Sequence, residues 1–207
     1  MDGIRNFRDL DSDNDGIGDV IEGGNSDADR NGFIGKSALV LNNLGQVITD
    51  ADGLIFEPNF SPLDSDGDGL DNLIDLDSDN DGIGDVIEGG NKDEDQDGFI
   101  GNEALIFTAL GQVLADELGN SFLPNTLPLD TDGDGIFNLV DLDSDNDGIG
   151  DVIEGGNRDF DQDGFIGTSP LIFNRFGQAV SDEEELFFII NEPVSYTHLT
   201  LPTILLV

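Results

Sequence analysis

The chain of 207 residues carries 46 Asp and Glu residues against 7 Lys and Arg residues, which gives a formal net charge of −39 at pH 7. Self-repulsion of this size opposes a compact fold unless bound cations neutralise it. The same charge argues against nucleic acid and anionic membrane surfaces as partners. The absence of Cys excludes disulfides and thiolate chemistry. The sequence also lacks an apolar run of about 18 residues, the length that would predict a membrane-spanning helix.

A perfectly repeated segment organises the chain. The sequence DLDSDNDGIGDVIEGGN occurs three times at a spacing of 66 residues, at 9–25, 75–91 and 141–157, here called the first, second and third shared runs. A fixed period of this length predicts a tandem array of similar units. The predicted units are 2–67, which starts within a repeat, 68–133, and 134–193, which is truncated. The chain is therefore interpreted as a fragment of a longer protein.

The last residues do not share the composition of the repeats. Residues 194–207 contain no Asp, Glu or Gly, but they hold the chain's only Tyr and only His. The string VSYTH at their start resembles a translated sequencing-adapter end. We therefore predict that 194–207 is an adapter scar and assign no role to His198. The alternative is a genuine hydrophobic strand at the C-terminus.

The shared runs have the register of a calcium-binding loop. When Asp77 is numbered as position 1, Asp also stands at positions 3, 5 and 9, Gly at position 6 and Glu at position 12. This is the ligand register of an EF-hand loop, in which carboxylates and the position-7 carbonyl surround Ca²⁺. The predicted ligands are Asp11, Asp13, Asp15, Ile17, Asp19 and Glu22; Asp77, Asp79, Asp81, Ile83, Asp85 and Glu88; and Asp143, Asp145, Asp147, Ile149, Asp151 and Glu154.

Two further kinds of acidic loop flank the shared runs. The loops before them also close on an acid at position 12, whereas the loops after them have Ala38, Ala104 or Pro170 at that position. The later loops are therefore weaker and must borrow a ligand from a nearby Asn or use water. The preceding loops supply Asp64, Asp66, Asp68, Leu70, Asn72 and Asp75, and Asp130, Asp132, Asp134, Ile136, Asn138 and Asp141; Asp2 and Asp9 are the predicted ligands of the corresponding loop at the start of the chain. The following loops supply Asn25, Asp27, Asp29 and Asn31; Asn91, Asp93, Asp95 and Asp97; and Asn157, Asp159, Asp161 and Asp163.

The spacing leaves no room for the helices of a true EF-hand, because only Leu76 separates Asp75 from Asp77. The predicted fold is mostly irregular: calcium-wrapped loop repeats with little regular secondary structure, arranged as an elongated tandem array. The spacers at about 36–63, 102–129 and 168–193 hold most apolar residues. A Gly between two apolar stretches in each spacer predicts short β-hairpins. In the second spacer, Leu110 and Leu114 are also spaced for one face of a helix, so that alternative stays open.

These residues resemble the thrombospondin type 3 repeats, whose DxDxDGxxD loops wrap around a string of Ca²⁺ ions. The GDVIE sequences at 18–22, 84–88 and 150–154 are similar to the family's GDVCD. Ile21, Ile87 and Ile153 stand where that motif has Cys, so the disulfide of animal repeats is missing. Cys-free versions resemble repeats in large secreted or surface proteins of Gram-negative bacteria. The resemblance implies an extracellular or cell-surface location and a role as stalk, adhesin or linker.

The sequence supports a calcium-binding structural region more strongly than its alternatives. Random acidity would give a disordered segment, but it would not fix Gly at position 6 and an apolar residue at position 7. Mg²⁺ fits less well because it demands strict octahedral geometry and keeps its waters. Catalysis is not expected, because the close carboxylate pairs lie in loop register and no nucleophile motif is present. We expect several Ca²⁺ ions in a calcium-rigidified stalk, with other domains of the parent protein or surface ligands as partners. The alternative is a calcium-dependent protein- or glycan-binding module that uses the spacers.

Overall fold

The structure is a computed structural model that describes residues 3–56, 62–102, 104–123 and 127–182. Asp2 and the predicted scar at 194–207, with His198, lie outside the described residues, as do parts of the spacers. Most of the described chain is loop and turn, which confirms the prediction of little regular secondary structure. Among the described residues, no helix is long and apolar enough to cross a membrane.

Each shared run ends in a single helical turn with the sequence DVIE. In the second run, Gly84 precedes this turn in an extended conformation, and Asp85 and Glu88 place their charges in its first turn, where the helix dipole favours acids. The turn stops at Gly90, whose φ of +81° is a left-handed conformation suited to glycine. The α-helices are α1 (Asp19–Glu22), α2 (Asp85–Glu88) and α3 (Asp151–Glu154); the 3₁₀ turns are η1 (Asn6–Arg8), η2 (Asn72–Ile74) and η3 (Asn138–Val140).

The spacers form three antiparallel two-stranded hairpins, as predicted. In the second spacer the chain reverses at Gly111, whose φ is +91°, so the helical alternative for this segment is wrong. The hairpins are β1–β2 (Val40–Leu41 and Val47–Thr49), β3–β4 (Ile106–Phe107 and Val113–Ala115) and β5–β6 (Leu171–Phe173 and Ala179–Asp182).

The hairpin of one repeat docks on the shared run of the preceding repeat. The N–H of Leu10 donates to the carbonyl of Leu110 at 2.9 Å, and the N–H of Leu76 donates to that of Phe176 at the same distance. The third acidic loop adds a second contact, because the N–H of Ile100 donates to the carbonyl of Asn14 at 3.0 Å. Each of these contacts recurs one period later, so the repeats interlock in the same way at both junctions.

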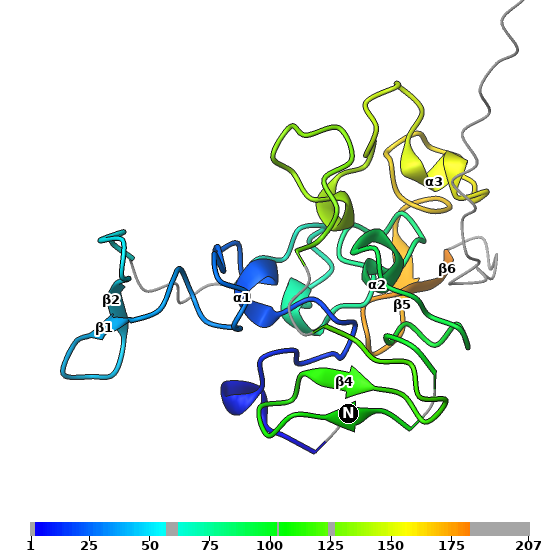
Figure 1. The fold of residues 1–207 in the computed structure, drawn as a ribbon. Helices are drawn as coiled ribbons and strands as arrows, with labels where there is room; N and C mark the ends of the chain where they lie inside the picture. Colours follow the sequence, from blue (N-terminus) through cyan, green and yellow to red (C-terminus); the bar gives the residue numbers. More distant parts are fainter. Residues whose placement is uncertain (1–2, 57–61, 103, 124–126, 183–207) are drawn as a thin grey trace, which may run out of the picture.

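For the first hairpin, no such contact is found among the described residues. In Figure 1, β1 and β2 project away from the rest of the chain, while α1, α2 and α3 follow one another across the molecule. The turn glycines show the same difference. A Cβ at Gly111 would overlap the carboxylate of Asp9 and one at Gly177 that of Asp75, whereas one at Gly45 would meet nothing within 4 Å.

The apolar core is divided into small clusters that lie beside the loops. Val86, Ile100 and Val113 form one cluster, in which α2, the third loop and the hairpin of one spacer meet. Val152, Ile166 and Ala179 repeat it one period later. A further cluster joins Ile17 and Ile21 of the first run to Leu139 in η3. Such small clusters bury little apolar surface, so the carboxylates are a large part of what the fold encloses.

Candidate metal centres

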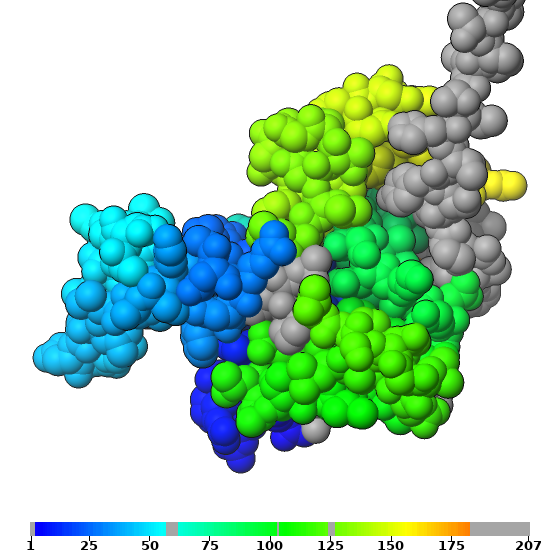
Figure 2. All heavy atoms as spheres, viewed as in Figure 1, coloured from blue at the N-terminus to red at the C-terminus, as the bar shows by residue number. Residues whose placement is uncertain are grey.

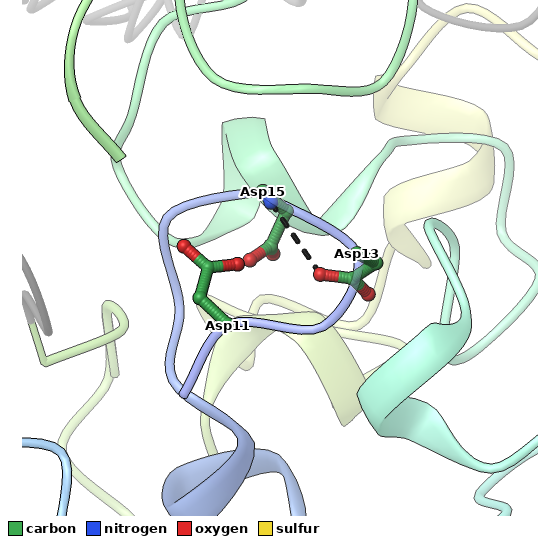
Figure 3. A group of neighbouring side chains, drawn as sticks. All are labelled: Asp11, Asp13 and Asp15. Carbon is green, nitrogen blue, oxygen red and sulfur yellow. Dashed lines mark hydrogen bonds between the residues drawn. The ribbon is translucent and has the colours of Figure 1, made fainter. Parts of the chain in front are cut away.

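The first shared run curls into a loop whose carboxylates converge. Asp11, Asp13 and Asp15 turn toward a common centre (Figure 3), and one oxygen of each lies within 4.8 Å of the others. The loop is held in this shape by its own carboxylates, because Asp15 Oδ1 accepts the N–H of Ile17 at 2.6 Å and Asp13 Oδ1 that of Asp15 at 3.4 Å. Gly16 follows with a φ of +93°. The second run forms the same cluster from Asp77, Asp79 and Asp81.

The inward oxygens of these loops lack protein partners. Asp11 Oδ1, Asp13 Oδ2 and Asp15 Oδ2 are buried and accept no hydrogen bond from any described residue. Both carboxylate oxygens of Glu22 are likewise buried and accept none. A buried carboxylate without a partner is costly. Sets of carboxylate oxygens are the ligands that Ca²⁺ takes. The residues present therefore fit a calcium ion, which would supply the missing positive charge to the oxygens of the loop.

Burial and mutual repulsion raise the pKa values of these carboxyl groups above their ordinary values. Burial raises the pKa of Asp15 to about 7. Burial, with the added charge of Asp151, raises the pKa of Asp81 to about 8. The pKa of Glu88 is raised well above its usual range by burial and then by Asp79. An ion pair lies outside these clusters, between the exposed side chains of Lys36 and Asp52.

Burial of the same loop differs along the chain. Position 7 shows this directly, because Ile17 and Ile83 are 0% and 3% exposed whereas Ile149 is 46% exposed. The first two runs are covered by the repeat that follows each of them. A Cβ at Gly82 would meet Asn157 and Ile166, while one at Gly148 would meet nothing within 4 Å. The third run therefore presents the same predicted ligands in a more open setting.

The loops before the shared runs are more exposed than the runs themselves. Asp64, Asp66 and Asp68 form a cluster that reaches the surface. Burial raises the pKa of Asp66 to about 7, and its carboxylate accepts the side-chain amide of Asn80 in the following run. Asp75, which closes this loop at position 12, is buried, and burial followed by the charge of Asp85 raises its pKa to about 9. Asp130, Asp132 and Asp134 repeat the loop geometry, with Asn146 donating to Asp132.

The third loops fold around one aspartate each, which is buried in the first two repeats (Asp27, Asp93) and half-buried in the third (Asp159). In the second repeat, Asp93 accepts the N–H groups of Asp97 and Gly98 at 3.2 and 2.8 Å. Asp27 and Asp159 do the same in their loops. Asn91 lies elsewhere, because its amide donates to the carbonyl of Asp15 at 3.3 Å, and Asn157 contacts Asp81 in the same way. Whether these Asn oxygens also serve a third loop stays a prediction.

Position 9 is fixed by a serine that the sequence analysis did not single out. Ser78 donates its N–H and its hydroxyl to the two carboxylate oxygens of Asp85 at 2.8 and 2.6 Å. Ser12 and Ser144 hold Asp19 and Asp151 in the same way. In the preceding loops, Asn72 and Asn138 stand at position 9. Each accepts the backbone N–H of Ser65 or Thr131 and donates its amide to the hydroxyl of the same residue. The signal was a hydroxyl residue at position 2 of every loop of these two kinds.

Comparison with known families agrees with the loop geometry. Residues 76–102 and 142–167 match the model of the thrombospondin type 3 repeat. Two segments of the chain are thus similar to thrombospondin type 3 repeats. These segments begin in the second and third shared runs and extend through the third loops. Repeats of this family are calcium-binding structural modules of extracellular proteins and not enzymes. No curated protein and no solved structure matches the chain.

Proposed function

We propose that this chain is a calcium-rigidified stalk or spacer of a larger secreted or cell-surface, adhesin-like protein. The observation that carries the proposal is the set of buried, convergent carboxylate oxygens that have no hydrogen-bond partner among the described residues. Several Ca²⁺ ions would neutralise this charge and turn the loops into a fixed support. The match to a family of calcium-binding structural repeats supports the same conclusion.

The packing of the spacers also favours a structural role. The second and third hairpins each bury one apolar residue against the loops, Val113 and Ala179, with exposures of 2% and 1%, while Ile106 and Ile172 are 54% and 51% exposed. Apolar residues used inside the array are not available for ligands. In the proposal the three units, 2–67, 68–133 and 134–193, form an elongated tandem array, and no catalytic role is assigned to them.

Small-angle scattering with and without chelator tests the stalk. A chain of about 193 residues has a radius of gyration of roughly 47 Å when unfolded and about 16 Å when compact. In chelator the chain should approach the larger value, because its unneutralised carboxylates repel one another. In millimolar Ca²⁺ an intermediate value and an elongated profile are expected. The same compact particle in both conditions would refute the calcium support and the stalk together.

A second candidate is a calcium-dependent protein- or glycan-binding module, which one observation favours. The first hairpin stands apart from the body of the molecule (Figure 2), and it exposes Leu41, Leu44 and Val40 by 53%, 79% and 50%. An exposed apolar patch of this kind is typical of an interaction site. Binding to a glycan array that requires Ca²⁺ and is lost in Leu44→Asp would establish this role.

A further inference from the structure

Carboxylates from two different repeats meet at each junction. Asp15 and Glu22 of the first shared run come together with Asp85 of the second, with one oxygen of each within 4.8 Å of the others. Asp81, Glu88 and Asp151 form the same buried group one period later. Asp85 and Asp151 occupy position 9 of their own loops. In an EF-hand that position serves the residue's own loop, whereas here it also faces the ligands of the preceding one.

The glutamates at these junctions point into the group without any protein partner. Glu22 is 2% exposed and Glu88 is 0% exposed. Neither oxygen of either residue accepts a hydrogen bond from any residue that the structure describes, and the same holds for Asp15 Oδ2 and Asp81 Oδ2. Unpaired acceptors at this depth indicate a missing electropositive partner at the junction itself. This observation is separate from the clustering of the acids.

The third member of each group is held in place by its own loop. Ser78 donates two hydrogen bonds to Asp85, and Ser144 does so to Asp151, which fixes each carboxylate toward the junction. Repulsion across the junction is also evident. Asp15, Glu22 and Asp85 bring one carboxylate oxygen each within 4.8 Å of the others across the repeat boundary. Buried carboxylate oxygens this close together, without hydrogen-bond donors for all of them among the described residues, favour a bound cation.

We propose that a Ca²⁺ ion binds at each junction and crosslinks neighbouring repeats. One ion is held by Asp15, Glu22 and Asp85, and the other by Asp81, Glu88 and Asp151. Asp15 and Asp81 are then shared with the ion of their own loop, and backbone carbonyls or water complete the coordination. The inference rests on the proposed calcium-binding function, but it adds a specific consequence: calcium fastens one repeat to the next.

The third shared run provides an internal comparison. Glu154 and Asp147 have the same register as Glu88 and Asp81, but both are exposed because no described repeat covers them. Among the described residues, the third run therefore has the loop ligands without a position-9 aspartate from another repeat beside them. The difference between the runs lies in the junction and not in the sequence, which is identical.

Amide hydrogen exchange on the full chain can read each junction separately. The N–H of Ile100 donates to Asn14 across the first junction, and that of Ile166 donates to Asn80 across the second, at 3.0 and 2.9 Å. Asp85→Asn should lower the protection of Ile100 more than that of Ile166, because Asp85 is also a predicted ligand of the second loop. Asp151→Asn should lower the protection of Ile166 and leave that of Ile100 unchanged. With a dissociation constant of about 0.1 mM, an ion at 2 mM Ca²⁺ supplies roughly a 20-fold protection. Each variant should therefore lose about 20-fold at its own junction.

Calcium dependence separates an ion from a structural contact. The deficit of Asp85→Asn should grow as Ca²⁺ is raised, and equilibrium dialysis should count one ion fewer than in the unmodified chain. Asp52→Asn, which removes one exposed charge outside the loops, controls for net charge. A deficit that is constant with Ca²⁺, an unchanged ion count, or equal losses at Ile100 and Ile166 would overturn the crosslink. If Asp85→Asn does not fold, Glu22→Gln tests the same junction from its other side.

The two levels of the hypothesis fail in different ways. A chain that binds no Ca²⁺ in dialysis would refute the proposed function, and the crosslink with it. A chain that binds Ca²⁺ in its loops but shows no junction-specific loss would refute the crosslink alone.

Discussion

Replacing Glu88 with Gln should change stability in opposite directions with and without calcium. The side chain is fully buried, its two oxygens have no partner in the described chain, and burial raises its pKa well above the usual range. With Ca²⁺ the carboxylate serves as a ligand, so its loss weakens binding. Without Ca²⁺ the charge only opposes folding, so its removal should help the chain to fold.

The magnitude in calcium follows from the expected affinity. An ion with a dissociation constant of about 0.1 mM at 2 mM Ca²⁺ contributes about 1.8 kcal/mol, and a 100-fold weakening removes nearly all of it. Glu88→Gln should therefore cost about 1–2 kcal/mol for each ion it serves. In a chain of this length that corresponds to a melting temperature lowered by about 2–8 °C.

Two measurements complete the test. Calorimetry in 2 mM Ca²⁺ gives the loss, and refolding by trimethylamine oxide in chelator gives the gain, because osmolytes favour burial. Glu88→Gln should refold at a lower osmolyte concentration than the unmodified chain. Glu154→Gln is the matched control, because its side chain is exposed, so it should gain little in chelator. A change of the same sign for Glu88→Gln in both conditions would contradict its assignment as a buried calcium ligand.

Three further outcomes are expected. In chelator the chain should be more folded at pH 5.5 than at pH 8.5, as measured by circular dichroism. Burial raises the pKa of Asp81 to about 8, so the contribution of this group to the free energy of unfolding is full below about pH 4 and is lost as the pH rises through 8. A chain that is more folded at pH 8.5 would contradict this. Gly177→Ala should lower the free energy of unfolding by about 1–3 kcal/mol more than Gly45→Ala. Both glycines have a positive φ, but only Gly177 lies against a buried carboxylate of the second run. Equal melting temperatures for the two variants would exclude the docking of the third hairpin. Asp79→Asn should remove a stronger site than Asp97→Asn, because the loop of Asp97 lacks an acid at position 12, and equal losses in calorimetric titration would reverse this ranking.

Local features of this fold could be predicted from sequence because each is fixed by neighbouring residues. Alternate aspartates before Gly82 produce the loop, and a glycine between apolar stretches produces the hairpin. The junctions could not be predicted in this way. The sequence predicts Asn91 as an additional ligand of the third loop in its own repeat. In the structure, its side-chain amide donates to the carbonyl of Asp15 in the first shared run. The period of 66 residues shows that the units are alike without showing which face of one meets the next.

The same period hides the difference in burial between identical runs. Ile83 and Ile149 occupy the same position of the same sequence, yet only Ile83 is covered by a following repeat. Burial here depends on what lies a full period away along the chain, and no local pattern reports it. The residues that hold the loop and the residues that hold the junction are partly the same, which is why Asp85 and Asp151 appeared to belong to one loop only.

The docking of the second and third hairpins on earlier runs sets the order in which the chain can finish folding during synthesis. The N–H of Leu10 can donate only after Leu110 has been made, and that of Leu76 only after Phe176. Each hydrogen bond therefore joins residues 100 positions apart in the sequence. At about 5–20 residues per second, a ribosome adds that length in roughly 5–20 seconds. Contacts between residues so far apart in sequence also make folding intrinsically slow. The first and second shared runs are therefore made well before the segments that cover them, and their junctions form about one and a half repeats behind the growing end of the chain.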